Sequence, residues 1–242
     1  MSWTPRKRFW QRAAVVPLVG GFGVSLDAKP LATPGGQTLV VPTAALARAL
    51  ADEWDAIEGE IRPERLPLTR AANSAIDRVP PQRAAVVDAI AAYGGADLLC
   101  YRAAAPEALA GRQEAGWDPW LSWAARTLGA PMVAVTGVVH EPQPAPTLAA
   151  LRTAVDAHDA FALVALNELV TLSGSLVLGL AVARGALGAG EAWELSRIDE
   201  TWQAEQWGAD PEADALAAGR RAEFLRARRL LDLLAAEASA PE

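Results

Sequence analysis

The run Phe161–Ala183 places the strongest limit on the fold, because it is 23 residues long and almost wholly apolar. A helix of that length can cross a bilayer. However, Asn167 and Glu168 lie together near its middle, and Ser173-Gly174-Ser175 follows. Polar and charged groups of this kind are costly in lipid. We therefore predict two helices, or one helix kinked at the Ser-Gly-Ser segment, in a helical core, and no membrane insertion.

Residues 1–42 have the pattern of a small antiparallel sheet. Short apolar segments at Ala13–Leu18, Val24–Leu26 and Thr38–Val41 alternate with turns that are rich in glycine and proline. The glycines at 20, 21 and 23 lack the G-x-G-x-x-G spacing of a dinucleotide-binding loop, and no βαβ pattern follows them. We predict a three-stranded meander without a nucleotide site.

After Pro42 the pattern becomes helical, with Thr43 as the predicted N-cap of the first helix. Further helices are predicted over residues 71–78, 84–93, 106–128, 147–170, 172–187, 190–206 and 211–234, and short extended segments over 97–102 and 132–139. The predicted fold class is α+β, with a small N-terminal antiparallel β-rich domain and a larger α-helical domain. We set the first, with its helix, at residues 1–60 and the second at 61–242.

Composition narrows the possible partners and the compartment. The net charge of −7 and the pI near 5.0 argue against nucleic acid, which requires a concentrated basic surface. Cys100 is the only cysteine, so an intramolecular disulfide and a multi-cysteine zinc site are excluded. The start of the chain lacks the pattern of a secretory signal. We expect a reducing, cytoplasmic environment.

A search for catalytic motifs finds none. His140 and His158 lack the spacing of a zinc-protease motif, and a two-histidine metal site is less probable than two unrelated histidines. Cys100 with His140 is a formal nucleophile and base, but a lone cysteine in an apolar run is more often a small buried residue. No phosphate-binding loop is present. We predict no catalytic residue, no metal and no cofactor, which favours a binding protein.

The segment Glu191–Asp214 combines aromatic and acidic residues in one place. It has eight carboxylates, one base (Arg197) and three of the nine tryptophans of the chain. Gly208 is predicted to end one helix, and Asp210 is predicted to cap the next. For any single residue, an amphipathic helix with a solvated acidic face is a sufficient explanation. As a set, tryptophans and acids are suited to anchor and steer a protein partner.

Several short motifs, in order along nearly the whole chain, give it a resemblance to a known family. They are Lys7–Trp10, Val24–Asp27, Lys29–Leu31 with Thr33-Pro34, Leu46–Trp54, Pro67–Thr69, Ala75–Arg78, Asp97–Arg102, Gln113 with Trp117–Pro119, Thr171–Leu180 and Asp199–Gly208. The chain resembles the F1-ATP synthase assembly chaperones specific for the α subunit, of the assembly factor 2 type.

The resemblance implies a non-enzymatic, ATP-independent chaperone. Such a protein binds the unassembled F1-ATPase α subunit, shields the surface destined for the β subunit and hands its client over during assembly. The resemblance also implies a β-rich domain followed by a helical one. Eukaryotic members work in mitochondria. We expect this chain, with its bacterial composition, to act as a cytoplasmic monomer.

The resemblance further indicates which residues matter. The important acid of the family lies in the motif matched by Ile198–Trp202, and either Asp199 or Glu200 is its counterpart. We predict that the client contacts are Asp199, Glu200, Trp202, Gln203, Trp207 and Asp210. Trp54 and Asp77 are predicted to be structural, since loss of a buried tryptophan costs about 3–5 kcal/mol.

Two other classes of function remain open at this point. A small hydrolase or isomerase would use acids near Asp199 in a cleft between the two parts of the chain, and a pair of carboxylates in a deep pocket would favour it. A structural subunit would stay bound to the mature complex, whereas a chaperone would leave it.

Overall fold

The computed structural model describes residues 7–137 and 139–236. Their contacts group the chain into two compact units, each of which is described by itself. The first comprises Met1–Arg83, Ala160–Val164 and Arg229–Glu242, and the second comprises Ala84–Asp159 and Ala165–Arg228. The boundary predicted between residues 60 and 61 therefore falls inside the first unit.

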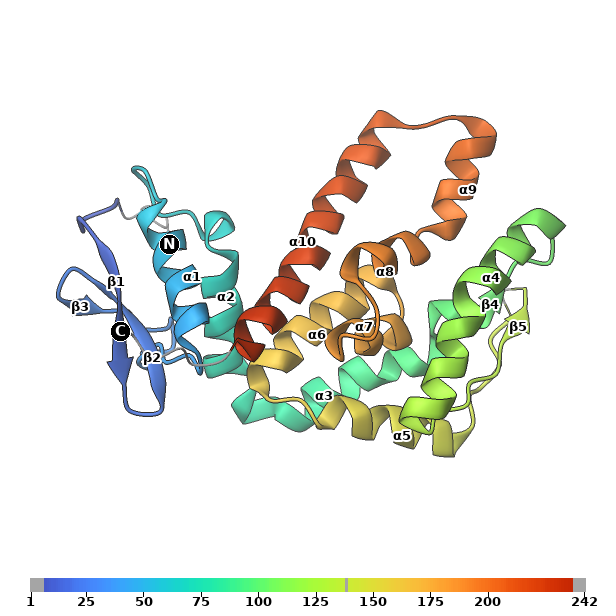
Figure 1. Ribbon diagram of the computed structural model, residues 1–242, viewed down its shortest axis with the longest axis horizontal. Coiled ribbons are helices and arrows are strands. Elements are labelled where there is room, and N and C mark those ends of the chain that lie inside the picture. The colour runs from blue at the N-terminus through green and yellow to red at the C-terminus, as the bar shows by residue number, and fades with distance from the viewer. Residues whose placement is uncertain (1–6, 138, 237–242) are drawn as a thin grey trace, which may run out of the picture. The chain divides into compact units, whose positions relative to one another are not determined.

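The first unit contains a small antiparallel sheet in the order β1-β2-β3 (Figure 1). The strands are β1 (Ala13–Leu18), β2 (Gly21–Leu26) and β3 (Lys29–Pro30). The predicted third strand at 38–41 is wrong, because this segment makes only isolated bridges, such as Val41 to Phe22. A tight turn at Asp27, whose φ is +52°, returns the chain at once, so β3 takes the place beside β2.

The first helix, α1 (Ala44–Asp55), is capped at both ends by side chains. Thr43 Oγ1 accepts a hydrogen bond from the Leu46 amide at 3.1 Å, which confirms the predicted N-cap. At the other end Arg8 Nη1 donates to the carbonyl oxygens of Asp55 and Ile57 at 2.6 and 3.0 Å. Since the last carbonyls of a helix have no partner within it, Arg8 fixes the N-terminal segment to the end of α1.

The second helix, α2 (Pro67–Asn73), begins against Glu53. The carboxylate of Glu53 accepts hydrogen bonds from the amides of Leu68 and Thr69 at 2.7 and 2.9 Å, and so satisfies two free donors of the helix start. Burial raises the pKa of Glu53, and these hydrogen bonds oppose part of that rise. Residues of α1 therefore position α2.

In the residues that the structure describes, the regular elements of the second unit are helices and two short parallel strands. Its helices are α3 (Arg83–Ala91), α4 (Glu107–Trp123), α5 (Ala145–Asp156), α6 (Ala160–Ser173), α7 (Leu176–Ala183), α8 (Ala189–Leu195), α9 (Ile198–Trp207) and α10 (Pro211–Ala235), of which α3, α6 and α10 extend into the first unit. Its strands are β4 (Tyr101–Arg102) and β5 (Val135–Thr136). Single turns of 3-10 or π-helix occur in the chain at Pro63–Arg65, Ser74–Arg78, Pro80–Gln82, Ala92–Ala96, Leu98–Cys100 and Ala124–Leu128.

Two long predicted helices are each divided in the structure. The predicted helix over 147–170 is interrupted at residues 157–159, and the one over 190–206 is interrupted at Ser196 and Arg197. Ser196 Oγ donates to the Trp193 carbonyl at 2.7 Å, which offers this turn a local alternative to continued helix. The fold class is nevertheless confirmed as α+β, with a small N-terminal antiparallel sheet followed by a larger helical region.

The apolar run Phe161–Ala183 forms α6 and α7, with a break at the predicted Ser-Gly-Ser segment. Gly174 has a φ of +70°, and Ser175 caps α7 by accepting from the Leu178 amide at 3.0 Å. Asp97, which is fully buried, accepts from the Val177 amide at 3.0 Å. No described helix is long and apolar enough to span a membrane.

Candidate functional site

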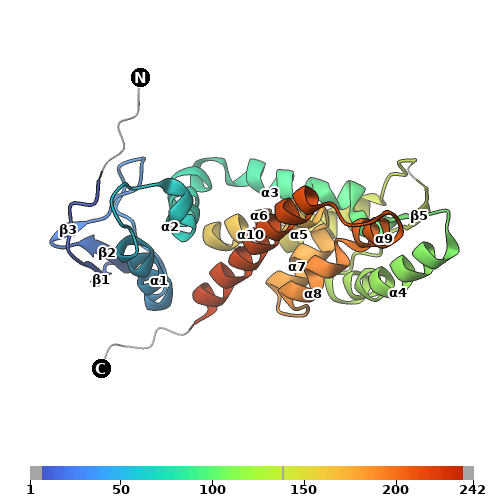
Figure 2. The same ribbon diagram turned by 90° about the horizontal axis from the view of Figure 1, so that it is seen from above.

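The candidate site is built on α9, which lies beside α4 in both views (Figures 1 and 2). Gly116 of α4 makes this close packing possible. A Cβ atom at that position would lie 2.8 Å from Ile198 Cδ1 and 3.1 Å from Leu195 Cδ2. The indole nitrogen of the buried Trp117 also donates to the Leu195 carbonyl at 2.8 Å. Gly116 therefore allows the start of α9 to approach α4 closely, and the hydrogen bond from Trp117 fixes the end of α8 just before it.

Asp199 is tied to the interior of the second unit. Its Oδ1 accepts a hydrogen bond from Gln113 Nε2 at 2.6 Å, and Gln113 is 1% exposed. The other end of the same amide, Oε1, accepts from the Ala103 amide at 2.7 Å. Because a buried amide left without a partner is costly, Asp199 has a structural role in addition to any contact with a client.

Glu200 differs from Asp199 although the two residues are adjacent. It is exposed, and its carboxylate forms an ion pair with Arg197 at 2.5 Å. An exposed pair of this kind contributes little to stability, about 0–1 kcal/mol. In contrast to Asp199, Glu200 is held, among the described residues, only by an exposed ion pair.

Arg112 of α4 contacts two residues of α9, Trp202 and Glu205. Its Nη1 donates to both carboxylate oxygens of Glu205 at 2.9 and 2.8 Å, and its guanidinium lies 4.9 Å from the centroid of the Trp202 ring. Stacking of this type holds an aromatic ring in place while leaving its outer face available. Trp202 is accordingly half-buried. Gln203, in contrast, is exposed.

Trp207 ends α9 with its side chain 79% exposed. Gly208, with a φ of +97°, terminates the helix as predicted. Asp210 Oδ1 accepts from the Glu212 amide at 2.9 Å, so Asp210 is the predicted cap of α10. Capping of α10 explains the presence of Asp210 without any need for a contact with a partner protein. Nothing comparable accounts for the exposure of Trp207.

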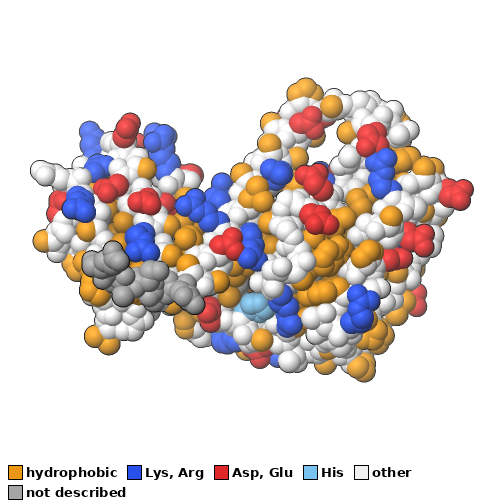
Figure 3. Space-filling view, viewed as in Figure 1, with side chains coloured by type: hydrophobic (Ala, Val, Ile, Leu, Met, Phe, Trp, Pro, Cys, Tyr) orange, Lys and Arg blue, Asp and Glu red, His pale blue; other side chains and the backbone are white. Residues whose placement is uncertain are grey.

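The charge around Trp207 is negative. Between Ile198 and Gly219 the chain has six carboxylates and no lysine or arginine. Arg197 and Arg112 neutralise two of them, whereas Glu212 and Asp214 have no ion-pair partner among residues 7–137 and 139–236. Figure 3 shows an opening between α9 and α10, with hydrophobic side chains gathered below it over α8. The exposed Trp207 thus lies in a carboxylate-rich segment of the chain, residues 198–219, called here the acidic segment.

The two predicted structural residues both lie in the first unit. Trp54 Nε1 donates to Thr69 Oγ1 at 3.1 Å, and its ring lies edge to face with Trp10 at 5.2 Å. Asp77 accepts from Thr33 Oγ1 at 2.7 Å and from the Gly35 amide at 2.8 Å. Each residue joins two separate segments of the unit, as a structural residue should, and the stability role of both stays a prediction.

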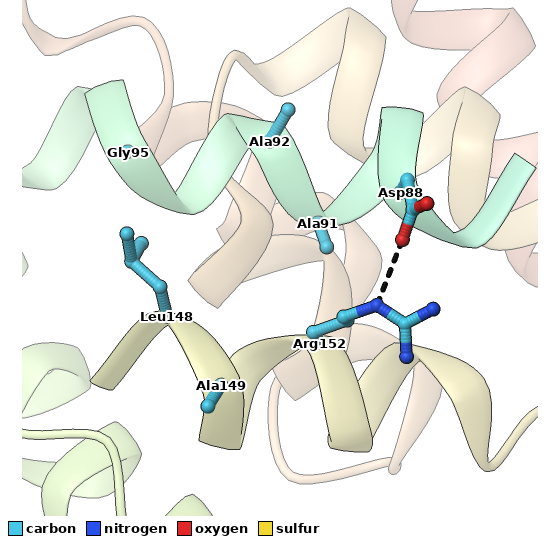
Figure 4. Close-up of a pocket in the computed structure, with 7 residues that line it drawn as sticks. All are labelled: Asp88, Ala91, Ala92, Gly95, Leu148, Ala149 and Arg152. Atoms are coloured by element: carbon cyan, nitrogen blue, oxygen red, sulfur yellow. Dashed lines mark hydrogen bonds and ion pairs between the residues drawn. The ribbon is translucent and has the colours of Figure 1, made fainter. Parts of the chain in front are cut away.

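A groove between α3 and α5 bears on the hydrolase alternative (Figure 4). It has a volume of about 290 Å³ and is lined by Asp88, Ala91, Ala92, Gly95, Leu148, Ala149 and Arg152. Asp88 is its one carboxylate and pairs with Arg152 at 2.7 Å. The groove therefore lacks the pair of acids that such an enzyme needs, and no residue of α9 lines it.

No hydrogen bond joins the other groups considered as catalytic, Cys100 and His140, in the described part of the chain. Cys100 is buried, and burial together with the charge of Asp97 raises the pKa of its thiol to about 12. His140 Nδ1 lies 2.9 Å from the hydroxyl of Tyr101. No group of three or more metal-ligating side chains occurs among the described residues. A buried thiol with a raised pKa is a poor nucleophile, because the thiolate is the reactive form.

Sequence reasoning missed Arg112, and it gave Gln113 no role in the site. The two lie 93 and 86 positions from their partners on α9, Glu205 and Asp199. No local spacing rule connects residues so far apart, and charge alone does not single out one arginine among many. A glycine at 116 within a helical pattern was the available signal, since such a glycine often marks close packing.

Comparisons with known proteins agree with the fold and the motifs. Residues 7–125 match the model of the ATP12 chaperone protein family. The crystal structure of Atp12 from Paracoccus denitrificans is 51% identical, with a TM-score of 0.90, and the match covers 94% of this chain and 98% of that one. A mutant of the same Atp12p, with lysine in place of an aspartate, is 50% identical with a TM-score of 0.90 over 94% and 97%. The mitochondrial protein atp12 of Schizosaccharomyces pombe is 24% identical over 217 residues, 84% of this chain and 74% of that protein.

Proposed function

Because the chain belongs to the ATP12 family of chaperones for F1-ATPase assembly, we propose that its client is the unassembled α subunit of F1. The chaperone would cover the surface that the β subunit later occupies, and the β subunit would displace it. In this proposal the protein acts as a monomer in the bacterial cytoplasm, without ATP or catalysis. The similarity to Atp12 of a bacterium supports this setting.

The observation that carries the proposal is the exposed Trp207 at the end of α9, within the acidic segment of residues 198–219. A tryptophan buries about 150–250 Å² when it enters an interface, and such residues often dominate the binding energy. The exposed acids Glu200 and Asp210 and the amide of Gln203 lie on the same segment. Trp202, held by Arg112, and Asp199, held by Gln113, give the surface a fixed shape before binding.

Aggregation of purified F1 α subunit in nucleotide-free buffer tests the proposal. The protein should suppress aggregation at a near-equimolar ratio and form a complex that added β subunit dissolves. Trp207→Ala should weaken the complex by about 2 kcal/mol or more, as for other interface tryptophans. Absence of both suppression and complex would refute the proposal.

Charge reversal gives a matched comparison. Glu200→Lys should weaken the complex, because the acidic segment would lose part of its complementarity to a basic client surface. Glu141→Lys makes the same change at an exposed loop position and should have no effect. Equal effects of the two would show that net charge, and not the α9 surface, governs binding. Recovery of the protein with mature F1 in fixed stoichiometry would identify a permanent subunit instead.

A further inference from the structure

The first half of α10 is a helix almost without packing partners. Residues 211–223, called here the exposed segment of α10, are all exposed except Ala217, and the first buried residue of the helix is Phe224. Figure 1 shows α10 rising past α8 and connecting by a loop to the end of α9. Helices in proteins are stabilised mainly by burial of one face, so this segment lacks its usual source of stability.

The exposed segment nevertheless continues the apolar stripe of the buried part of the helix. Phe224 is fully buried and packs near the Trp193 ring, with 5.8 Å between centroids. Ala217 and Ala213 precede Phe224 by seven and eleven residues, spacings that return to the same face of a helix. Leu216, which is 59% exposed, precedes the buried Ala227 by eleven residues and so lies on the same face as Ala227. The stripe therefore extends beyond the core.

Charge indicates what can cover this stripe. Glu212 and Asp214 lie at the start of the segment without ion-pair partners in the described part of the chain. Arg220 and Arg221 lie further along the same segment, and Arg221 Nε lies 3.7 Å from Glu194 Oε1. Four of the six acids between residues 198 and 219 form no ion pair in the described part of the chain, namely Asp199, Asp210, Glu212 and Asp214. A second copy of this chain would therefore bring two acidic surfaces together, and anionic lipid would be repelled. A partner of net positive charge is complementary.

We propose that the exposed segment of α10 is a docking surface for a net-basic amphipathic helix of the client, which packs its apolar face on Ala213, Leu216 and Ala217. The two small residues let a partner helix approach closely, and Leu216 provides the apolar contact. The basic end of the client helix lies over Glu212 and Asp214. This inference rests on the proposed function, because the client supplies the helix, and it extends the surface around Trp207 along α10.

Thiol footprinting tests directly whether the client covers the proposed docking surface on α10. The single native thiol, Cys100, is buried and has a pKa raised to about 12, so a maleimide reagent labels an introduced cysteine selectively. Leu216→Cys places a thiol on the stripe, and Ala215→Cys places one on the far side of the same helical turn. With F1 α subunit at ten times its Kd, labelling of Leu216→Cys should slow about tenfold, and labelling of Ala215→Cys by less than about twofold.

Each possible result of the labelling experiment either supports or overturns the proposed docking surface on α10. If the complex forms and both variants label at the rate of the free protein, or both are protected equally, the docking face is wrong while the proposed function stands. If the wild-type protein forms no complex with α subunit, the proposed function fails and this inference fails with it. Concentration-dependent protection of Leu216→Cys in the free protein would identify a second copy as the occupant and overturn the proposal.

Affinity measurements give an independent readout. Leu216→Glu should weaken the complex roughly 10- to 100-fold, the loss expected for burial of one leucine side chain. Ala215→Glu introduces the same charge one residue away and should change affinity less than about twofold, since the far side of the helix stays in solvent. Far-UV circular dichroism should show the same helix content in both. Equal losses of affinity would overturn the proposal.

Discussion

Replacement of Asp199 and of Glu200 by lysine should separate the two acids, although they are adjacent. In Asp199→Lys the ammonium group cannot accept the hydrogen bond from Gln113 Nε2, which leaves a buried amide donor without its partner at 2.6 Å. The cost of such an orphaned group is about 1–3 kcal/mol. Asp199 is itself half-buried, so water replaces part of the bond, and we expect about 1–2 kcal/mol in the free energy of unfolding.

Glu200→Lys loses only an exposed ion pair with Arg197 and should cost less than about 0.5 kcal/mol. Denaturant unfolding followed by tryptophan fluorescence measures both values, because the slope and midpoint give the free energy. Asp199→Asn, which retains an oxygen acceptor for Gln113, is the control and should lie close to the wild type. If Asp199→Lys unfolds at the wild-type midpoint, or if Glu200→Lys costs as much as Asp199→Lys, the assignment of structural and accessible roles is refuted.

Two further perturbations test the packing of the second unit. Burial raises the pKa of Asp97, so the stability from this group is fully present below its ordinary value of 3.8 and is lost as the pH rises through the folded pKa. The advantage of the wild type over Asp97→Asn in denaturant titrations should therefore be largest at acid pH and shrink on alkalinisation; a widening gap would contradict it. Gly116→Leu should force α9 away from α4 at a cost of about 1–3 kcal/mol and speed amide exchange in α9. Gly111→Leu, where a Cβ meets open space on the same helix, should do neither, and equal exchange in both variants would count against the packing argument.

Local rules worked where the chain signals its own conformation. Thr43 before an apolar helical pattern and Asp210 before Pro211 are helix starts that need only their neighbours, and both caps are present. The Ser-Gly-Ser break in the apolar run also lies where predicted. The same rules failed at Thr38–Val41, because pairing in a sheet depends on which edge is already occupied.

The sequence also singled out the segment on which we propose the client site. Acids and tryptophans are concentrated between residues 191 and 214, and composition is a property of the chain before it folds. The sequence did not distinguish the role of Asp199 from that of Glu200, since neighbours in sequence have the same local sequence environment. The structure separates them, because a rotation of about 100° per residue turns one toward Gln113 and the other toward solvent.

Family, fold class and the position of most elements were thus determined by the sequence itself, through ordered motifs, helix caps and apolar patterns. The tertiary structure decided which residues contact the site: Arg112 pairs with Glu205 and lies over the Trp202 ring, and Gln113 donates to Asp199. It also decided that the face of α10 around Leu216 stays exposed. These contacts join residues far apart in the chain or depend on whether a neighbouring element is present. Such facts belong to packing in three dimensions, which periodicity along the chain does not encode.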